Sequence, residues 1–163
     1  MRDLGVVQHG AGILTEPART FDLPAERDEA ERIVDELLAA IERIGQVHRF
    51  AKGMGIAAPQ IGIARAAAIV LPPDDAPAVV LLNPRITDRP EERDEQYEGC
   101  LSFFDVRGLV SRPLKITVEA TALTGETTTT LYERGLARLI HHEIDHLSSC
   151  RWQASSHPTR RRN

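Results

Sequence analysis

The stretch His142-Glu143-Ile144-Asp145-His146 decides how the rest of this 163-residue chain is interpreted. An α-helix turns once every 3.6 residues, so the two histidines lie on one face and can hold one divalent metal ion. Glu143 follows the first histidine directly, and its carboxylate can reach a water on such an ion without being a ligand. The pattern is typical of metal-dependent hydrolases of the zincin type.

Two histidines leave a third ligand to be found. Beyond His146 the sequence offers Cys150 and His157 among polar residues, so we expect the ligand upstream. Cys100 is the best candidate, because a thiolate binds zinc or ferrous iron strongly and a glycine precedes it, which allows a close backbone approach. Another segment shaped by glycines, Gly53-Met54-Gly55-Ile56-Ala57-Ala58-Pro59-Gln60, ends in a side-chain amide.

These segments, GMGIAAPQ at residues 53–60, EGCLS at 98–102 and HEIDH at 142–146, resemble in this order the three signature motifs of peptide deformylases. The resemblance covers most of the chain, from about residue 4 to residue 147. It implies an α+β fold and the removal of the N-formyl group from formylmethionyl peptides. It also implies that Cys100, His142 and His146 hold the metal and that Glu143 is the base.

The same resemblance implies further roles around the metal. The backbone N–H of Leu101 and the side-chain amide of Gln60 would stabilise the oxyanion, and Met54 and Gly55 would lie beside the substrate. Leu139 shares one helix face with the histidines, so we expect it to form a wall of the pocket for the substrate side chain.

The expected cofactor is a single divalent metal ion. One thiolate and two imidazoles suit zinc, ferrous iron, cobalt or nickel, and the resemblance favours ferrous iron in the cell. The expected partners are a formylmethionyl peptide and, transiently, the ribosome.

Three other interpretations explain part of the sequence. A nucleophilic amidase would use the Cys100 thiolate to attack the carbonyl, but it leaves the paired histidines and Glu143 unexplained. A related hydrolase of another N-acyl substrate or small metabolite would account for the departures from the family. Phe104 stands where a proline is common, His141 where a glutamine is usual, and the sequence after Leu147 is polar. An inactive relative would retain the motifs, and only an assay distinguishes it.

Composition predicts one small enzyme, with a catalytic domain in residues 1–150 and a disordered basic tail in residues 151–163. The formal charge of −4 provides no basic face for nucleic acid, so we expect no DNA binding. We find no apolar stretch long enough to span a membrane. Two cysteines, one of them assigned to metal, give no disulfide framework and favour the cytoplasm.

The pattern of apolar residues predicts small mixed or antiparallel sheets packed around a C-terminal metal-binding helix, with one long N-terminal helix. Helices are expected at Glu26–Phe50 and Tyr132–Leu147. Short apolar runs predict strands at Ala66–Leu71 and Val79–Leu82, and alternation predicts a hairpin from Leu114–Ala122 to the threonines at 127–130. The charged segment at 88–96 is expected to be exposed.

Overall fold

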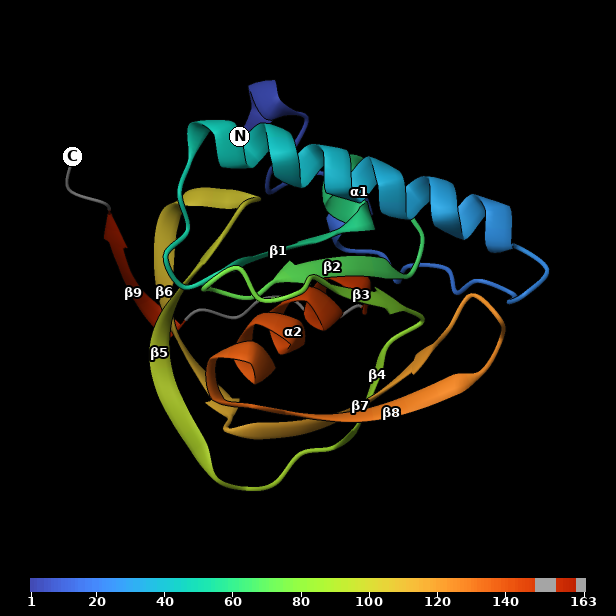
Figure 1. Cartoon of the computed structure of the whole chain (residues 1–163). Coiled ribbons are helices and arrows are strands. Elements are labelled where there is room, and N and C mark those ends of the chain that lie inside the picture. The colour runs from blue at the N-terminus through green and yellow to red at the C-terminus, as the bar shows by residue number, and fades with distance from the viewer. Residues whose placement is uncertain (149–154, 161–163) are drawn as a thin grey trace.

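The computed structural model describes residues 1–148 and 155–160. Within these residues, the α+β architecture consists of two α-helices, three short 3₁₀ helices and three antiparallel sheets of three strands each, which confirms the expected fold class (Figure 1). The elements, in chain order, are α1 (Arg27–Val47), β1 (Met54–Ala57), β2 (Ala67–Leu71), β3 (Val79–Leu82), β4 (Arg85–Asp88), β5 (Arg93–Cys100), β6 (Phe103–Pro113), β7 (Lys115–Thr121), β8 (Thr127–Glu133), α2 (Arg134–Leu147) and β9 (Ser155–Arg160).

The sheet β1-β2-β3 lies between the two helices, with α1 on one face and α2 on the other (Figure 1). Its central strand β2 is buried on both faces, and successive side chains point to opposite sides. Ala67 and Ile69 join the core cluster beneath α1, whereas Ala68 and Val70 join the cluster that includes α2. This two-sided burial explains why the strand was recognisable in the sequence as a continuous apolar run.

Helix α1 is amphipathic and buries one stripe against the sheet. Ile33, Leu37 and Ile44 are fully buried, whereas Leu38 is 41% exposed. The expected helix at Glu26–Phe50 is therefore confirmed, except that it ends at Val47 because His48 adopts an extended conformation. None of the described helices is both long and apolar enough to cross a membrane.

The sheet β4-β7-β8 contains the expected hairpin, in which β7 pairs with β8 from Lys115↔Glu133 to Thr121↔Thr127. The turn includes Gly125 at φ 90°, where an added Cβ would lie 2.8 Å from the carbonyl oxygen of Leu23. Strand β8 continues to Glu133, so α2 begins two residues later than the expected Tyr132.

The third sheet, β5-β6-β9, is built on a long hairpin that the sequence pattern did not predict (Figure 1). Strand β5 begins at Arg93, inside the charged segment that was expected only to be exposed, and ends at Cys100. Most of its side chains do face solvent, and its partner is the backbone of β6.

Ser155–Arg160, which lie in the segment expected to be a disordered tail, form β9 along β6. The register pairs Val106 with Arg160 and Leu109 with Ser155. A strand edge binds another segment through backbone hydrogen bonds, which require no apolar side chains in the added strand. The rest of the expected tail, residues 151–154 and 161–163, lies outside the described residues.

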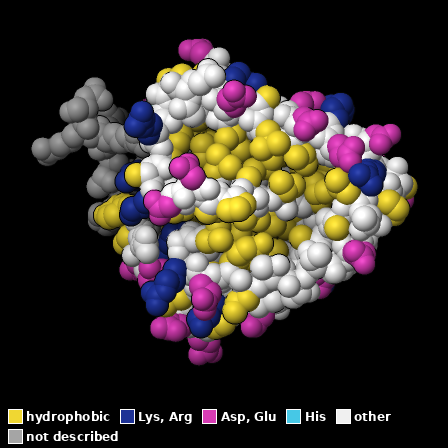
Figure 2. All heavy atoms as spheres, in the orientation of Figure 1, with side chains coloured by type: hydrophobic (Ala, Val, Ile, Leu, Met, Phe, Trp, Pro, Cys, Tyr) yellow, Lys and Arg dark blue, Asp and Glu magenta, His cyan; other side chains and the backbone are white. Residues whose placement is uncertain are grey.

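Hydrophobic side chains gather in the middle of the face presented in Figure 1, and charged side chains surround them (Figure 2).

Candidate functional site

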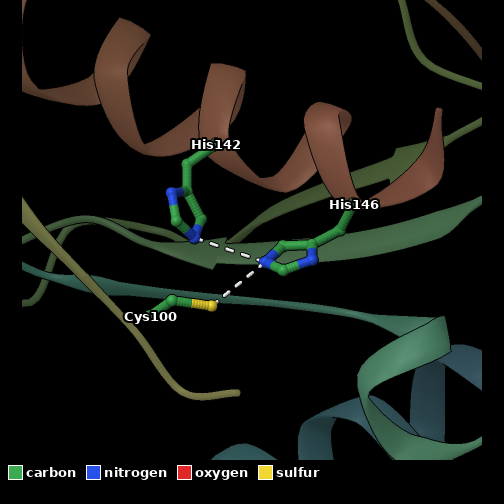
Figure 3. A group of neighbouring side chains, drawn as sticks. All are labelled: Cys100, His142 and His146. Carbon is green, nitrogen blue, oxygen red and sulfur yellow. Dashed lines mark hydrogen bonds between the residues drawn. The ribbon is translucent and has the colours of Figure 1, made fainter. Parts of the chain in front are cut away.

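Helix α2 and the end of β5 bring three potential metal ligands together. His142 and His146 lie one turn apart on α2, and their imidazoles point toward the Cys100 thiol (Figure 3). Cys100 Sγ lies 3.2 Å from His146 Nε2, which lies 3.3 Å from His142 Nε2, and all three donors fall within 4.8 Å of one another. Tetrahedral ligands at bond lengths of about 2.1–2.3 Å are roughly 3.3–3.7 Å apart, so the cluster fits one metal ion.

The electrostatics of the cluster also favour a bound cation. Burial opposes a charge on His142, but its hydrogen bonds with Cys100 and Glu98 outweigh burial and raise its pKa well above the usual value. Burial and the neighbouring His142 lower the pKa of His146 to about 3. The His146 imidazole is therefore neutral, whereas the surroundings of His142 favour a positive charge. A divalent ion bound by both histidines would meet both conditions.

An irregularity at the end of β5 positions the Cys100 thiol. The register between β5 and β6 shifts between Gly99 and Cys100, so Cys100 pairs with Phe103 across a two-residue turn. Within that turn Ser102 is buried and accepts a hydrogen bond from Gln60 Nε2 at 3.1 Å. The same nitrogen lies 3.6 Å from Cys100 Sγ.

The Gln60 side chain is held at its other end as well. Its Oε1 accepts a hydrogen bond from the Ala57 N–H at 2.9 Å, and the residue is 1% exposed. Gln60 itself does not line the pocket, whereas Leu101 does. The amide is therefore fixed against the cysteine, with its N–H groups directed at Cys100 and Ser102.

Glu143 is a buried carboxylate beside these potential metal ligands. It is 3% exposed, and its Oε2 has no hydrogen-bond partner among the described residues. Burial raises its pKa to about 7, partly offset by the charges on His142 and Arg112. A buried acceptor without a partner is rare in proteins and calls for a functional explanation.

Gly55 makes room for that carboxylate. A Cβ added at Gly55 would lie 2.5 Å from Glu143 Oε1 and 2.6 Å from its Cγ. The glycine was expected to leave space for the substrate backbone, and the structure shows that it also provides the space in which Glu143 stands.

A buried ion network orients His142, and sequence reasoning missed it. Glu98 Oε2 lies 3.1 Å from His142 Nδ1, which leaves the opposite nitrogen, Nε2, facing the thiol. Arg112 binds both Glu98 oxygens, at 2.7 and 2.9 Å, and Arg138 binds Oε1 at 2.6 Å. Burial would raise the pKa of Glu98, but the hydrogen bonds from His142 and Arg112 lower it. Such a partner fixes the orientation and tautomer of a ligating histidine.

The only sequence signals for this network were weak. Glu98 stands two residues before Cys100 in the same motif, and Arg138 lies one turn before His142 on α2.

The cluster opens into a cavity of about 190 Å³ between β1, the β5–β6 hairpin and α2. Met54, Gly55, Leu101 and Leu139 all line it, as expected of a substrate pocket. Phe104, the residue that departs from the family pattern, is also part of its wall. The remaining lining residues are Phe50, Lys52, Gly53, Gln96, Tyr97, Glu98, Gly99, Cys100, Arg107, Gly135, Arg138, His142 and Glu143.

Phe104, part of the pocket wall, also makes an aromatic contact. The rings of His48 and Phe104 lie 4.7 Å apart, so the residue that follows α1 packs against β6.

Known proteins with similar sequences and structures are peptide deformylases. The sequence profile of the family described as polypeptide deformylase matches residues 4–152. A peptide deformylase of Natranaerobius thermophilus is 37% identical over 132 residues, which covers 79% of this chain and 84% of that protein. One of Desulforudis audaxviator is 36% identical and covers 87% and 86%.

Solved structures agree with this assignment. A class I type b peptide deformylase from Acinetobacter baumannii, crystallised with Met-Ala-Ser, superposes with a TM-score of 0.77 at 32% identity, covering 88% of this chain and 92% of that chain. Peptide deformylase 1B of Arabidopsis thaliana superposes with a TM-score of 0.76 at 26% identity, covering 88% and 76%. The chain therefore belongs to the peptide deformylase family.

Proposed function

We propose that this peptide deformylase removes the N-formyl group from the N-terminal formylmethionine of nascent peptides by metal-dependent hydrolysis, with Glu143 as the base. The observation that carries the proposal is the buried carboxylate of Glu143, without a partner on Oε2, beside the cluster of Cys100, His142 and His146. A formamide resists hydrolysis, so the enzyme must supply a nucleophilic water, stabilise an oxyanion and protonate the leaving nitrogen.

Cys100, His142 and His146 would hold the ion, and Glu98 would keep His142 in the orientation that ligation requires. Such an ion, when bound, would supply Lewis acidity and would make a water nucleophilic near neutral pH. Glu143 takes a proton from that water and returns it to the leaving amine. Its burial supports this role, because a carboxyl with a pKa of about 7 can both accept and donate a proton near neutrality.

The oxyanion needs donors fixed in advance, and we assign the Leu101 N–H and the Gln60 side-chain amide. The contact between Gln60 and the Ala57 N–H supports the second assignment, because it orients the amide nitrogen toward the cysteine. Each donor in an oxyanion hole is worth about 3 kcal/mol of transition-state stabilisation. Leu139, Met54 and Gly55 would hold the methionine side chain and the adjacent backbone in the pocket.

We propose ferrous iron as the metal in the cell, with zinc, nickel or cobalt able to replace it at the same donors. We further propose that residues 1–150 form the catalytic domain and that the enzyme works in the cytoplasm, in transient contact with the ribosome and without binding DNA. The low cysteine content and the net charge of −4 support the compartment and the absence of DNA binding.

An anaerobic assay tests the activity directly. Metal-loaded protein should release formate from formyl-Met-Ala-Ser and leave acetyl-Met-Ala-Ser nearly untouched, because the acetyl methyl group has to fit where the formyl hydrogen lies. A small formamide serves as the third substrate. Turnover of the acetyl peptide or the small formamide in preference to the formyl peptide would favour the alternative of another N-acyl substrate, which the Phe104 wall motivates.

A further inference from the structure

The mouth of the pocket carries two positively charged side chains on different walls. Lys52 lies in the loop before β1, Arg107 lies on β6, and both line the cavity. Both residues are exposed. Within the part of the chain that the structure describes, neither side chain makes a hydrogen bond or an ion pair. The two charges are therefore available to a ligand that passes between them.

Both cations lie next to other residues that line the pocket. Arg107 pairs with Gly99 in the register of β5 and β6, and a Cβ added at Gly99 would lie 3.8 Å from Arg107 Nε. The Arg107 side chain thus lies across the residue next to Cys100. On the other wall, Lys52 precedes Gly53, whose added Cβ would lie 3.1 Å from Leu139 Cδ1.

No exposed acid balances these charges among the described residues that line the pocket. The two lining acids, Glu98 and Glu143, are buried, and Glu98 is already paired with Arg112 and Arg138. Asp105 lies on the same hairpin but outside the cavity lining.

We propose that the mouth selects formylated peptides with a carboxylate one to three residues after the formylmethionine. The carboxylate can belong to an acidic side chain or to the free C-terminus of a short peptide. The inference rests on the proposed function, because a peptide whose formyl group reaches Glu143 must leave the pocket past its mouth. Exposed ion pairs are weak, so the expected preference is about 3- to 10-fold in kcat/KM. It should shrink at about 1 M salt, where the screening length is short.

Two pairs of substrates isolate the charge and its source. Formyl-Met-Ala-Ser is compared with its C-terminal amide, and formyl-Met-Asp-Ser amide with formyl-Met-Asn-Ser amide. The charged member of each pair should be hydrolysed about 3- to 10-fold more efficiently at low salt. A preference within the first pair alone identifies the terminal carboxylate, and one within the second pair identifies the side chain. Equal rates in both pairs overturn the proposal.

Variants assign the preference to the two cations. Lys52→Gln and Arg107→Gln should each reduce it about 2- to 5-fold. Lys115→Gln is the matched control, because it makes the same change in net charge at an exposed position of β7 that does not line the pocket. If Lys115→Gln reduces the preference as much as Lys52→Gln does, general charge is responsible and the proposal is wrong.

A binding measurement separates this proposal from the activity. Metal-loaded Glu143→Gln protein is titrated calorimetrically with the same four peptides, which it should bind without turnover. Tighter binding of the charged peptides supports the charge preference of the pocket mouth even if the wild-type protein hydrolyses none of the four peptides. A lack of hydrolysis would refute only the deformylase activity. Equal affinities within both pairs overturn the inference whether or not the enzyme is active.

Discussion

Replacing Gly55 with alanine should inactivate the enzyme without removing its metal. The new methyl group would lie 2.5 Å from Glu143 Oε1, 2.6 Å from Cγ and 2.7 Å from the carboxyl carbon. Ordinary contacts between such atoms need about 3.5 Å, so the Glu143 side chain has to move by about 1 Å. A misplacement of about 1 Å in a reacting group can cost about 10²-fold in rate. We therefore expect Gly55→Ala to lower kcat by about 10²-fold.

The assay is formate release from formyl-Met-Ala-Ser by protein of known metal content. The matched control is Gly45→Ala in α1, where an added Cβ meets nothing within 4 Å and the variant should keep wild-type turnover. Metal bound per chain should equal the wild-type value in both variants, because neither residue is one of the three ligands. A Gly55→Ala variant with wild-type kcat would show that the position of the Glu143 carboxylate does not limit the reaction.

Three further predictions concern metal, pH and the C-terminal strand. Cys100→Ala should lower metal content severalfold, and chelators should abolish the activity of the wild-type protein; full metal stoichiometry in the variant would restore the nucleophile interpretation. His141→Gln should make the protein less sensitive to acid. Burial lowers the pKa of His141 to about 4 in the folded protein, whereas the pKa in the unfolded chain is about 6.5. The contribution of His141 to stability is therefore fully present above pH 6.5 and is lost as the pH falls toward about 4. Urea unfolding should show that the loss of unfolding free energy on acidification is up to about 3 kcal/mol smaller in His141→Gln than in the wild-type protein. Parallel curves of unfolding free energy against pH for the two proteins would contradict this role of His141. A chain truncated after Gln153 should still bind metal and turn over, but with a lower free energy of unfolding because β6 loses its partner strand; loss of metal would place an essential contact in β9.

The spacing of residues within short stretches of the sequence predicted α1, β2 and the histidine pair on α2. Helix α1 has its apolar residues at helical spacing, β2 is an unbroken apolar run, and the histidine pair on α2 is set by one turn of helix. Each of these signals lies within a single element, so sequence alone was sufficient.

The β5–β6 hairpin left no such signal. Strand β5 is mostly polar and exposed, and what holds it is backbone pairing with β6. Strand β9 escaped prediction for the same reason, because its six residues include no aliphatic side chain. A pattern of apolar residues reports burial, and most side chains of β5 are exposed.

The supporting groups of the site were hidden by distance along the chain. Glu98 is 14 residues from Arg112, 40 from Arg138 and 44 from His142, although all three contact it. Motifs predicted which residues form the cluster of a thiol and two imidazoles, but not the arginines that bind Glu98 beside His142. Pairings of this kind follow from the packed fold and not from any local spacing.

Glu143→Gln tests whether a buried carboxylate is the base of the metal-dependent hydrolysis. The amide keeps the shape of the side chain and removes the base. The decisive measurement is formate release per bound metal ion, made anaerobically on wild-type and variant protein with formyl-Met-Ala-Ser. The account predicts equal metal content and a loss of at least about 10²- to 10⁴-fold in turnover. Near wild-type turnover by the metal-loaded glutamine variant would contradict it.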